Sequence, residues 1–564
     1  MSELQACPSR LGLVVSALVC AWVLVLPAEA AACGGFFCSA STPVNQAAER
    51  IVFVEHDDQT VTAVVQIQYS GPAERFSWVL PVVGSPTVGL SSDIVFTRLQ
   101  QLSDPRYQLN TRVEGECASP LFASQDAAVF ADSGPLIVDA GLSPPVTVIA
   151  HSTIGPYIYD VIQLDPGLSS PGEVAVQWFA ENGYDVSGVG ASTLGTYLLR
   201  GMNLIAFKLE KGNSVGTLRP IRIRFDMGCP AVPIRPTAEA AAPDMGVLVW
   251  VVGRSRAVPT NYLSLELNEA ALDWARGASN YSDVVTQAAN EAGGHGFVTE
   301  HAAPSSAYRG VVFQAGDDAY ERYDWENATL GELLSALIQR YSTWNGLPEF
   351  VTSVFDSPVT PQALSNCLTF EPDCSLASLG TLNTRHTDRA AFRAAFEAEV
   401  IDPVRETDAL FSQGAYVTRL FTTLSADEMT VDPQFDFNPD LADVSNVHQA
   451  ERVIYCSPQR TFLDSPWTAT LPNGQQVHGV GSAWPVALGP NMPALYSAKQ
   501  LSTSGPGQLV LDNGDRIVLP RPPSVGGAAG GACSAGFGAL GGPWGATLVS
   551  LALIALLRRR AIAL

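Results

Sequence analysis

Lysine is nearly absent from this chain of 564 residues, in which only Lys208, Lys211 and Lys499 occur. Arginine supplies the rest of the 32 basic residues, which face 55 acidic ones, so the formal net charge is −23. A field of this sign repels phosphate backbones and anionic lipid surfaces. We therefore expect no nucleic-acid partner. Cations and basic partners are compatible with the charge, although we interpret it mainly as a source of solubility.

Recognisable catalytic motifs are also lacking. The chain contains no H-E-x-x-H pair, no Walker loop, no dinucleotide-binding glycine pattern and no internal repeat. Ser482 lies among glycines, but a nucleophile elbow requires G-x-S-x-G, and the spacing here differs. We interpret Ser482 as a loop serine. The sequence therefore names neither a reaction nor a ligand.

Two weaker constellations contain histidine. His295, Glu300 and His301 gather two imidazoles and a carboxylate, but the neighbouring glycines oppose the helix that would place them on one face. We favour a structural role over a metal site. Cys456 and His448 offer a thiol nucleophile and a base, although nothing in the sequence brings them together.

The best ligand-like signal is an acidic turn after residue 435. Oxygen ligands at alternate positions can wrap calcium, as in the first half of an EF-hand loop. The candidate ligands are Asp436, Asn438, Asp440 and Asp443. Leu441 replaces the EF-hand glycine and Val447 the closing glutamate, so the motif is incomplete. An acidic, proline-containing turn without metal is the alternative that we prefer.

The first thirty residues have the layout of a secretory leader. Arg10 precedes the apolar run Leu11–Leu26, and Ala28 and Ala30 form a cleavage site. This order predicts a signal peptide over residues 1–30 and export of the remaining chain. A lipoprotein anchor at Cys33 is the alternative, but Ala30 stands where a larger aliphatic residue is usual.

The last residues predict a membrane anchor. A proline- and glycine-rich linker, 521–532, precedes the tail 533–564. Within the tail an uncharged run, Ala535–Leu557, is long enough to cross a hydrocarbon core of about 30 Å, and Arg558–Arg560 would hold its end in the cytoplasm. The tail resembles the myxobacterial C-terminal sorting tag (MYXO-CTERM). That resemblance implies processing or lipid attachment at Cys533, and a plain single-span anchor is the alternative.

Outside the cytoplasm the cysteines should form disulfides. Close spacing favours two local bridges, Cys33–Cys38 and Cys367–Cys374. Cys117, Cys229 and Cys456 remain, so two of them can pair while one stays free. Zinc needs four thiolates or imidazoles at short spacing, and no C-x-x-C or H-x-x-H is present.

The patterning predicts an α+β fold. Arg50–His56 and Val61–Tyr69 form a predicted antiparallel hairpin, and Phe76–Leu80 adds a strand. We expect a β-rich, sandwich-like and antiparallel subdomain over residues 31–270. A mixed, more helical subdomain is expected over residues 271–520.

Three local signals refine this picture. Ser170 and Glu173 predict a capping box before a helix that starts at Pro171. Thr329 and Glu332 predict a second capping box, followed by leucines on one face. Asn513-Gly514 predicts a hairpin turn between strands 507–511 and 516–519.

Several segments of the chain resemble the bacterial family called domain of unknown function 2330. The residues that carry the resemblance are CGGFFC (33–38), PVNQAAERIVF (43–53), VTAVVQIQYSGPAERFSWVLPV (61–82), and the stretches Gly246–Leu267, Ala289–Glu300 and Tyr416–Met429. The resemblance implies a secreted or envelope protein and supplies no activity and no catalytic residues.

We therefore expect a non-enzymatic surface protein, anchored in the envelope, that binds an unidentified protein or small molecule. The main alternative is an extracytoplasmic hydrolase with an unrecognised site. A third possibility is a calcium-stabilised adhesion protein.

Overall fold

The computed structural model describes residues 46–67, 76–118, 146–185, 190–209, 218–226, 229–239, 241–355, 359, 363, 366, 388–489 and 491–522. The predicted leader and membrane span lie outside these residues, as do Cys33, Cys38, Cys367, Cys374 and Cys533. The chain divides into one compact unit, Met1–Arg521, and a second unit, Pro522–Leu564. None of the helices in the described ranges is long and apolar enough to cross a membrane.

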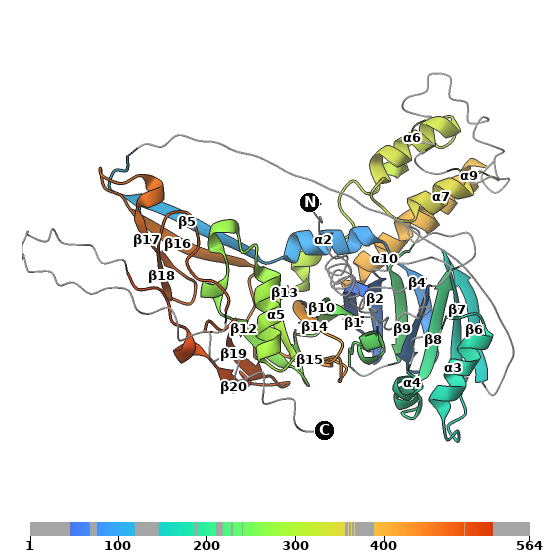
Figure 1. Cartoon of the computed structure of the whole chain (residues 1–564). Helices are drawn as coiled ribbons and strands as arrows, with labels where there is room; N and C mark the ends of the chain where they lie inside the picture. The colour runs from blue at the N-terminus through green and yellow to red at the C-terminus, as the bar shows by residue number, and fades with distance from the viewer. Residues whose placement is uncertain are drawn as a thin grey trace, which may run out of the picture. The chain divides into compact units, whose positions relative to one another are not determined.

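A ten-stranded mixed sheet forms the centre of the first unit (Figure 1). Its order is β20 (Gln508–Asp512), β19 (Leu495–Gln500), β12 (Leu263–Leu267), β13 (Gly296–Pro304), β14 (Tyr416–Leu424), β10 (Ala241–Gly253), β1 (Gln46–Glu55), β2 (Thr60–Ile67), β9 (Ile221–Asp226) and β4 (Thr87–Leu90). The predicted hairpin is confirmed, because β1 and β2 pair antiparallel. However, β1 pairs with β10 in parallel and β12 with β13 in parallel, so the sheet is not purely antiparallel. The sheet contains strands from both predicted subdomains, residues 31–270 and residues 271–520.

A four-stranded antiparallel sheet packs on one face of this sheet and confirms the predicted sandwich. Its order is β3 (Ser77–Val82), β8 (Asn203–Leu209), β7 (Tyr157–Leu164) and β6 (Val146–Ile154). Ile51 and Phe53 of β1 share a buried core with Trp78 and Phe207, whose rings lie 5.5 Å apart. Helices α3 (Pro171–Glu181) and α4 (Ala191–Leu198) pack against the four-stranded sheet through a separate apolar cluster that includes Val79 and Leu204.

The prediction of a capping box at Ser170 is wrong in part. Helix α3 does begin at Pro171, but the Ser170 side chain forms no capping hydrogen bond with any described residue. Its backbone, with φ −133° and ψ 63°, departs from the extended conformation that directs an N-cap oxygen toward the helix N–H groups.

A group of helices packs on the other face of the large sheet and extends away from it in the upper part of Figure 1. They are α2 (Asp93–Ser103), α6 (Leu330–Tyr341), α7 (Leu347–Ser353), α9 (Arg389–Phe396) and α10 (Asp402–Leu410). Leu248, Trp250 and Val252 of β10 pack among their apolar side chains. The second capping box is confirmed, since the Thr329 hydroxyl accepts from the backbone N–H of Glu332 while the Glu332 carboxylate accepts from that of Thr329.

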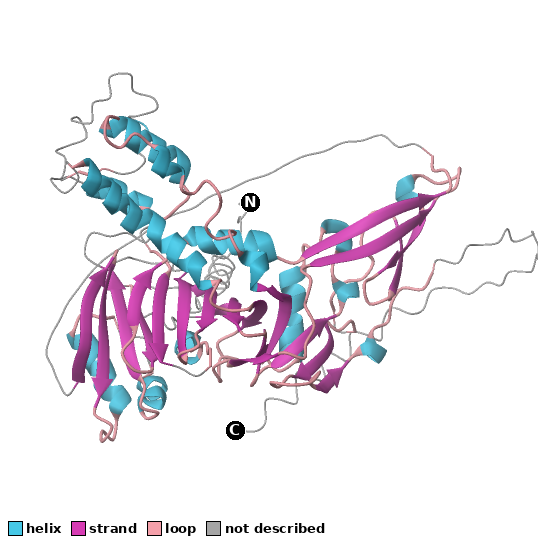
Figure 2. Cartoon of the chain, turned by 180° about the vertical axis from the view of Figure 1, so that it is seen from behind, coloured by secondary structure: helices cyan, strands magenta, loops and turns pink. Residues whose placement is uncertain are grey.

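A second four-stranded sheet extends from the body (Figure 2). Its order is β18 (Gln476–Val480), β17 (Pro466–Thr470), β16 (Val447–Tyr455) and β5 (Arg106–Glu114), with β5 and β16 parallel. Just beyond this pair a disulfide joins Cys117 to Cys456, with 4.8 Å between their Cα atoms. Cys229 is free and exposed. This bond identifies which two of the three remaining cysteines pair.

The hairpin predicted at Asn513-Gly514 is wrong. After β20 the chain enters a 3-10 turn, Gly514–Arg516, and the described residues 517–519 form no strand. Asn513 has φ −108°, whereas a type I′ turn requires positive φ. Its backbone N–H donates to the Tyr496 carbonyl and its side-chain amide donates to the Leu495 carbonyl. These bonds to β19 fix the conformation of Asn513.

The disulfide should stabilise the extended sheet. Replacing both Cys117 and Cys456 with serine removes the cross-link across a separation of 339 residues. We expect the free energy of unfolding to fall by about 2–4 kcal/mol, because the unfolded chain regains conformational freedom. Denaturant titration measures this change, and Cys229→Ser is the matched control because Cys229 is exposed and unbonded. Alkylation of Cys117 and Cys456 in the native protein without reductant would contradict the bond.

Candidate functional site

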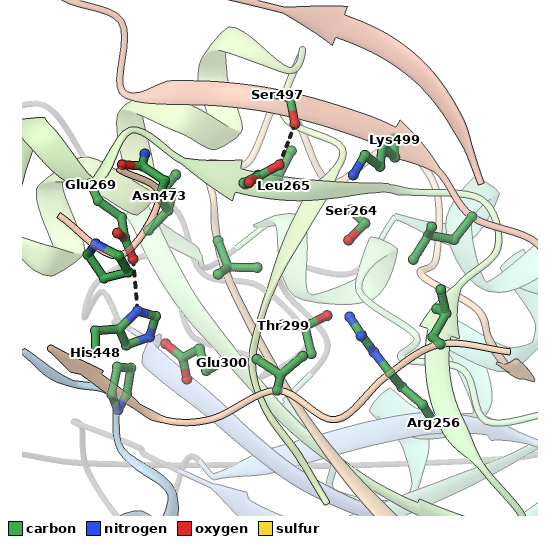
Figure 3. Close-up of a pocket in the computed structure, with 18 of the residues that line it drawn as sticks. Arg256, Ser264, Leu265, Glu269, Thr299, Glu300, His448, Asn473, Ser497 and Lys499 are labelled. Atoms are coloured by element: carbon green, nitrogen blue, oxygen red, sulfur yellow. Dashed lines mark hydrogen bonds and ion pairs between the residues drawn. The ribbon is translucent and has the colours of Figure 1, made fainter. Parts of the chain in front are cut away.

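A polar cleft of about 540 Å³ lies where the large sheet meets the extended sheet (Figure 3). Strands β12, β13 and β19 supply one part of its lining, and β5 and β16 supply another. Arg256 comes from β11 (Arg256–Pro259), which pairs with β15 (Phe435–Asn438) beside the large sheet. The volume falls within the range of small-molecule sites, about 300–1,000 Å³.

One end of the cleft holds a histidine–carboxylate pair. The Nδ1 atom of His448 lies 2.8 Å from Oε1 of Glu269, and the imidazole stacks on Tyr107 with 4.4 Å between ring centroids. Glu269 begins a short 3-10 turn whose first residues are fixed by the Asn268 side chain. Its second oxygen, Oε2, is buried and has no hydrogen-bond partner among the described residues. The described part of the protein therefore leaves one oxygen of this carboxylate without a hydrogen-bond partner.

The earlier pairing of His448 with Cys456 as nucleophile and base is wrong, because Cys456 is held in the disulfide. A sulfur in a disulfide has no thiol to activate. The histidine instead takes a carboxylate partner that lies 179 residues earlier in the chain.

The carboxylate of Glu300, which is paired with Arg419, lines the inner part of the cleft. Glu300 is 3% exposed and accepts hydrogen bonds from the Tyr281 hydroxyl at 2.7 Å and from Nε of Arg419 at 2.5 Å. Burial raises the pKa of Glu300, and Arg419 opposes that shift. Burial, followed by the charges of Glu269 and Glu300, raises the pKa of Tyr107 well above its usual value. These groups keep the inner part of the cleft rigid and its phenols protonated.

The two histidines of the predicted motif around Glu300 form hydrogen bonds with other residues and not with Glu300. His295 lies 3.0 Å from the Thr430 hydroxyl, and His301 lies 2.8 Å from the Tyr308 hydroxyl. Strand β13 carries a bulge between Thr299 and His301, so the simple alternation of its side chains is broken here. The three residues of this motif thus have three different partners.

The opposite end of the cleft is cationic, as Figure 3 shows for Arg256 and Lys499. Arg256 donates through Nη1 to the Ala442 carbonyl at 2.8 Å, while its buried Nε lacks an acceptor within the described ranges. Burial lowers the pKa of Arg256. Lys499 is exposed, and its side-chain ammonium forms no hydrogen bond or ion pair with any residue that the structure describes. Hydroxyl groups of Ser264 and Thr299 lie between the two charged ends.

The calcium candidates form protein contacts beside β15. Asp436 pairs with Arg254 at 2.6 Å, the Asn438 amide donates to carbonyls of Ser502 and Gly505, and Asp440 accepts from the Gly505 N–H at 2.7 Å. Asp443 accepts from the Tyr416 hydroxyl. Among the described residues no group of three or more His, Cys, Asp or Glu is arranged to hold a metal. Calcium at these residues stays a prediction.

Sequence reasoning missed most of the cleft. Arg256, Glu269 and Lys499 lie on separate strands or turns, and no spacing along the chain relates them. The rarity of lysine was the one available signal, since Lys499 is one of only three.

Comparison with known proteins gives a family and no activity. No curated protein and no solved structure is detectably similar to the chain. The sequence model of a family described as an uncharacterized protein conserved in bacteria matches residues 27–363, a range that includes Arg256, Glu269 and Glu300 but not His448 or Lys499. Because this range exceeds half of the 564 residues, the chain belongs to the bacterial family DUF2330.

Proposed function

We propose that the protein is an exported, envelope-anchored binding protein whose cleft takes a small zwitterionic solute of the size of a short peptide. One observation carries this proposal. Two residues of opposite charge, Arg256 and Glu269, line the same cleft, and each has a buried polar atom, Nε and Oε2 respectively, without a hydrogen-bond partner among the described residues. A buried polar atom without a partner costs about 1–3 kcal/mol.

A ligand with a carboxylate and an ammonium group would complement the charges of both side chains. The carboxylate suits Arg256 and Lys499, because guanidinium and ammonium groups form short, charge-assisted bonds with carboxylates. The ammonium suits Glu269 at the other end. The hydroxyls of Ser264 and Thr299 between the two ends would accept or donate to a peptide group.

The proposed location has separate support. The leader pattern of residues 1–30 and the tail 533–564 favour export and a C-terminal membrane anchor, with Cys533 as the processing or lipid-attachment point. The Cys117–Cys456 disulfide agrees with folding in an oxidising compartment. The net charge of −23 disfavours nucleic acid as a partner.

Alanyl-alanine is a suitable probe of the cleft. We expect isothermal titration to detect its binding, and we expect either N-acetylation or C-amidation of the peptide to weaken binding about tenfold or more. Each modification removes one charge-assisted bond, which contributes about 1.5–3 kcal/mol.

Two charge-neutralising variants provide the matched controls. Arg256→Gln should weaken the preference for the free carboxylate while the preference for the free amine stays, and Glu269→Gln should abolish the preference for the free amine while the preference for the free carboxylate stays. If both blocked peptides bind to the native protein as well as alanyl-alanine does, the bipolar cleft is not the binding site.

A second candidate function, hydrolysis, is favoured by the His448–Glu269 pair. If Nδ1 of His448 donates to the carboxylate, Nε2 is free to accept a proton from water. A carboxylate that orients an imidazole in this way is a recurrent part of acid–base sites.

The two functions are separable with the same probe. Binding alone predicts that alanyl-alanine is recovered intact after long incubation, whereas hydrolysis releases alanine. If alanine is released, His448→Gln should reduce the rate by at least about 100-fold, because general acid–base catalysis contributes about 10²–10⁴. A rate that is unchanged in His448→Gln would exclude this histidine as the base.

Mass spectrometry of the native protein tests the proposed location. We expect the mature chain to begin at Ala31, and we expect either a modification at Cys533 or an end created there. A chain that retains residues 1–30 and has reduced thiols would contradict export. An intact, unmodified tail would contradict the sorting tag and leave a plain anchor.

A further inference from the structure

A second hollow lies inside the sandwich, between the ten-stranded sheet and β3. Its volume is about 100 Å³. Most of its lining is apolar and comes from both sheets, as shown by Ile51, Ala63, Val65, Trp78, Val82 and Phe225. Hydrophobic walls with few polar groups are typical of sites that take small organic molecules. We refer to this hollow as the sandwich chamber.

One carboxylate belongs to the lining of the sandwich chamber. Glu49 lies on β1, two residues before Ile51 and four before Phe53, so alternation along the strand places all three on the same face. Glu49 is 5% exposed, and its Oε2 has no hydrogen-bond partner in the described part of the chain. Buried carboxylates are normally paired, so this one requires an explanation.

Other charged groups near the chamber do not compensate Glu49. Asp432, which also lines it and is bonded to the Tyr197 hydroxyl at 2.7 Å, is itself a carboxylate and cannot offset a negative charge, and Arg200 is exposed. Glu49 also borders a hollow of about 470 Å³ that is lined by charged residues from four strands and from the end of α2, namely Arg50, Asp104, Asp244, Glu300 and Arg419. Burial alone raises the pKa of Glu49 to about 7, with no contribution from any of these charges.

We propose that the sandwich chamber binds a primary amine with a compact apolar body, whose ammonium group donates a hydrogen bond to Glu49. The apolar body occupies the space beside Ala63, Val65 and Trp78, where its removal from water favours binding. The ammonium supplies both the donor and the positive charge that Glu49 lacks. This site is separate from the polar cleft and does not depend on the function proposed for it.

The size of the chamber limits the ligand. An engineered cavity of about 150 Å³ accommodates benzene, so a chamber of about 100 Å³ suits an amine with a short alkyl chain. A hydroxyl group in place of the amine would offer one hydrogen bond without a charge. The two chemistries therefore predict different affinities for molecules of the same shape.

Isothermal titration of the full chain with n-butylamine and with 1-butanol at pH 8 tests the proposal. We expect the native protein to bind n-butylamine at least about tenfold more tightly than 1-butanol, and Glu49→Gln to lose that preference. Ala63→Leu fills the chamber and should abolish the binding of both probes. Equal affinities for n-butylamine in the native protein and in Glu49→Gln would overturn the proposal, as would the absence of binding in the native protein.

Thermal melting shows whether Glu49→Gln keeps the fold and tests the burial of Glu49. The pKa of about 7 in the folded protein exceeds the ordinary value of 4.5, so the folded state loses stability from this group as the pH rises from about 4.5 through 7. Glutamine does not titrate. Glu49→Gln should therefore melt at a higher temperature than the native protein at pH 8, and the two should converge at pH 4. A lower melting temperature for Glu49→Gln at pH 8 would contradict an uncompensated carboxylate and overturn the proposal.

Discussion

Strand β10 is buried on both faces, and the rest of the first unit depends on this double burial. Val247, Val249 and Val251 pack into the sandwich core, while Leu248 and Trp250 pack among the helices on the opposite face. Parallel pairing with β1 and antiparallel pairing with β14 connect the strand to segments from both ends of the chain. The near-continuous apolar run of β10 is what such a two-sided environment requires.

The polar cleft depends on the same strand through a short chain of buried contacts. The Trp250 indole donates to the Ser103 hydroxyl, which also accepts from Arg419. Arg419 in turn holds Glu300 in the inner part of the cleft and pairs with Asp104. Removing one partner of a buried ion pair costs about 3–5 kcal/mol, because the other charge is left uncompensated. The geometry of the cleft is therefore set by the core and not by a surface loop.

Local structure was largely predictable from the sequence, whereas long-range contacts were not. The β1–β2 hairpin and the helix after Thr329 follow from alternation and capping, which act over a few residues. At Asn513 the same reasoning failed because contacts with β19 override the local turn preference. The parallel partner of β1 begins about 195 residues later, and no local signal encodes it. The cleft was missed for the same reason, since Glu269 and His448 meet only through tertiary packing.

The pairing of β5 with β16 has a consequence for biosynthesis. A strand that ends at Glu114 acquires its neighbour only after residues 447–455 have been made, and the bond from Cys117 to Cys456 closes later still. Contacts between such distant segments slow folding and leave apolar edges exposed in the meantime. The nascent polypeptide therefore cannot mature piece by piece from its first residue, and it needs protection from aggregation until nearly the whole chain has emerged.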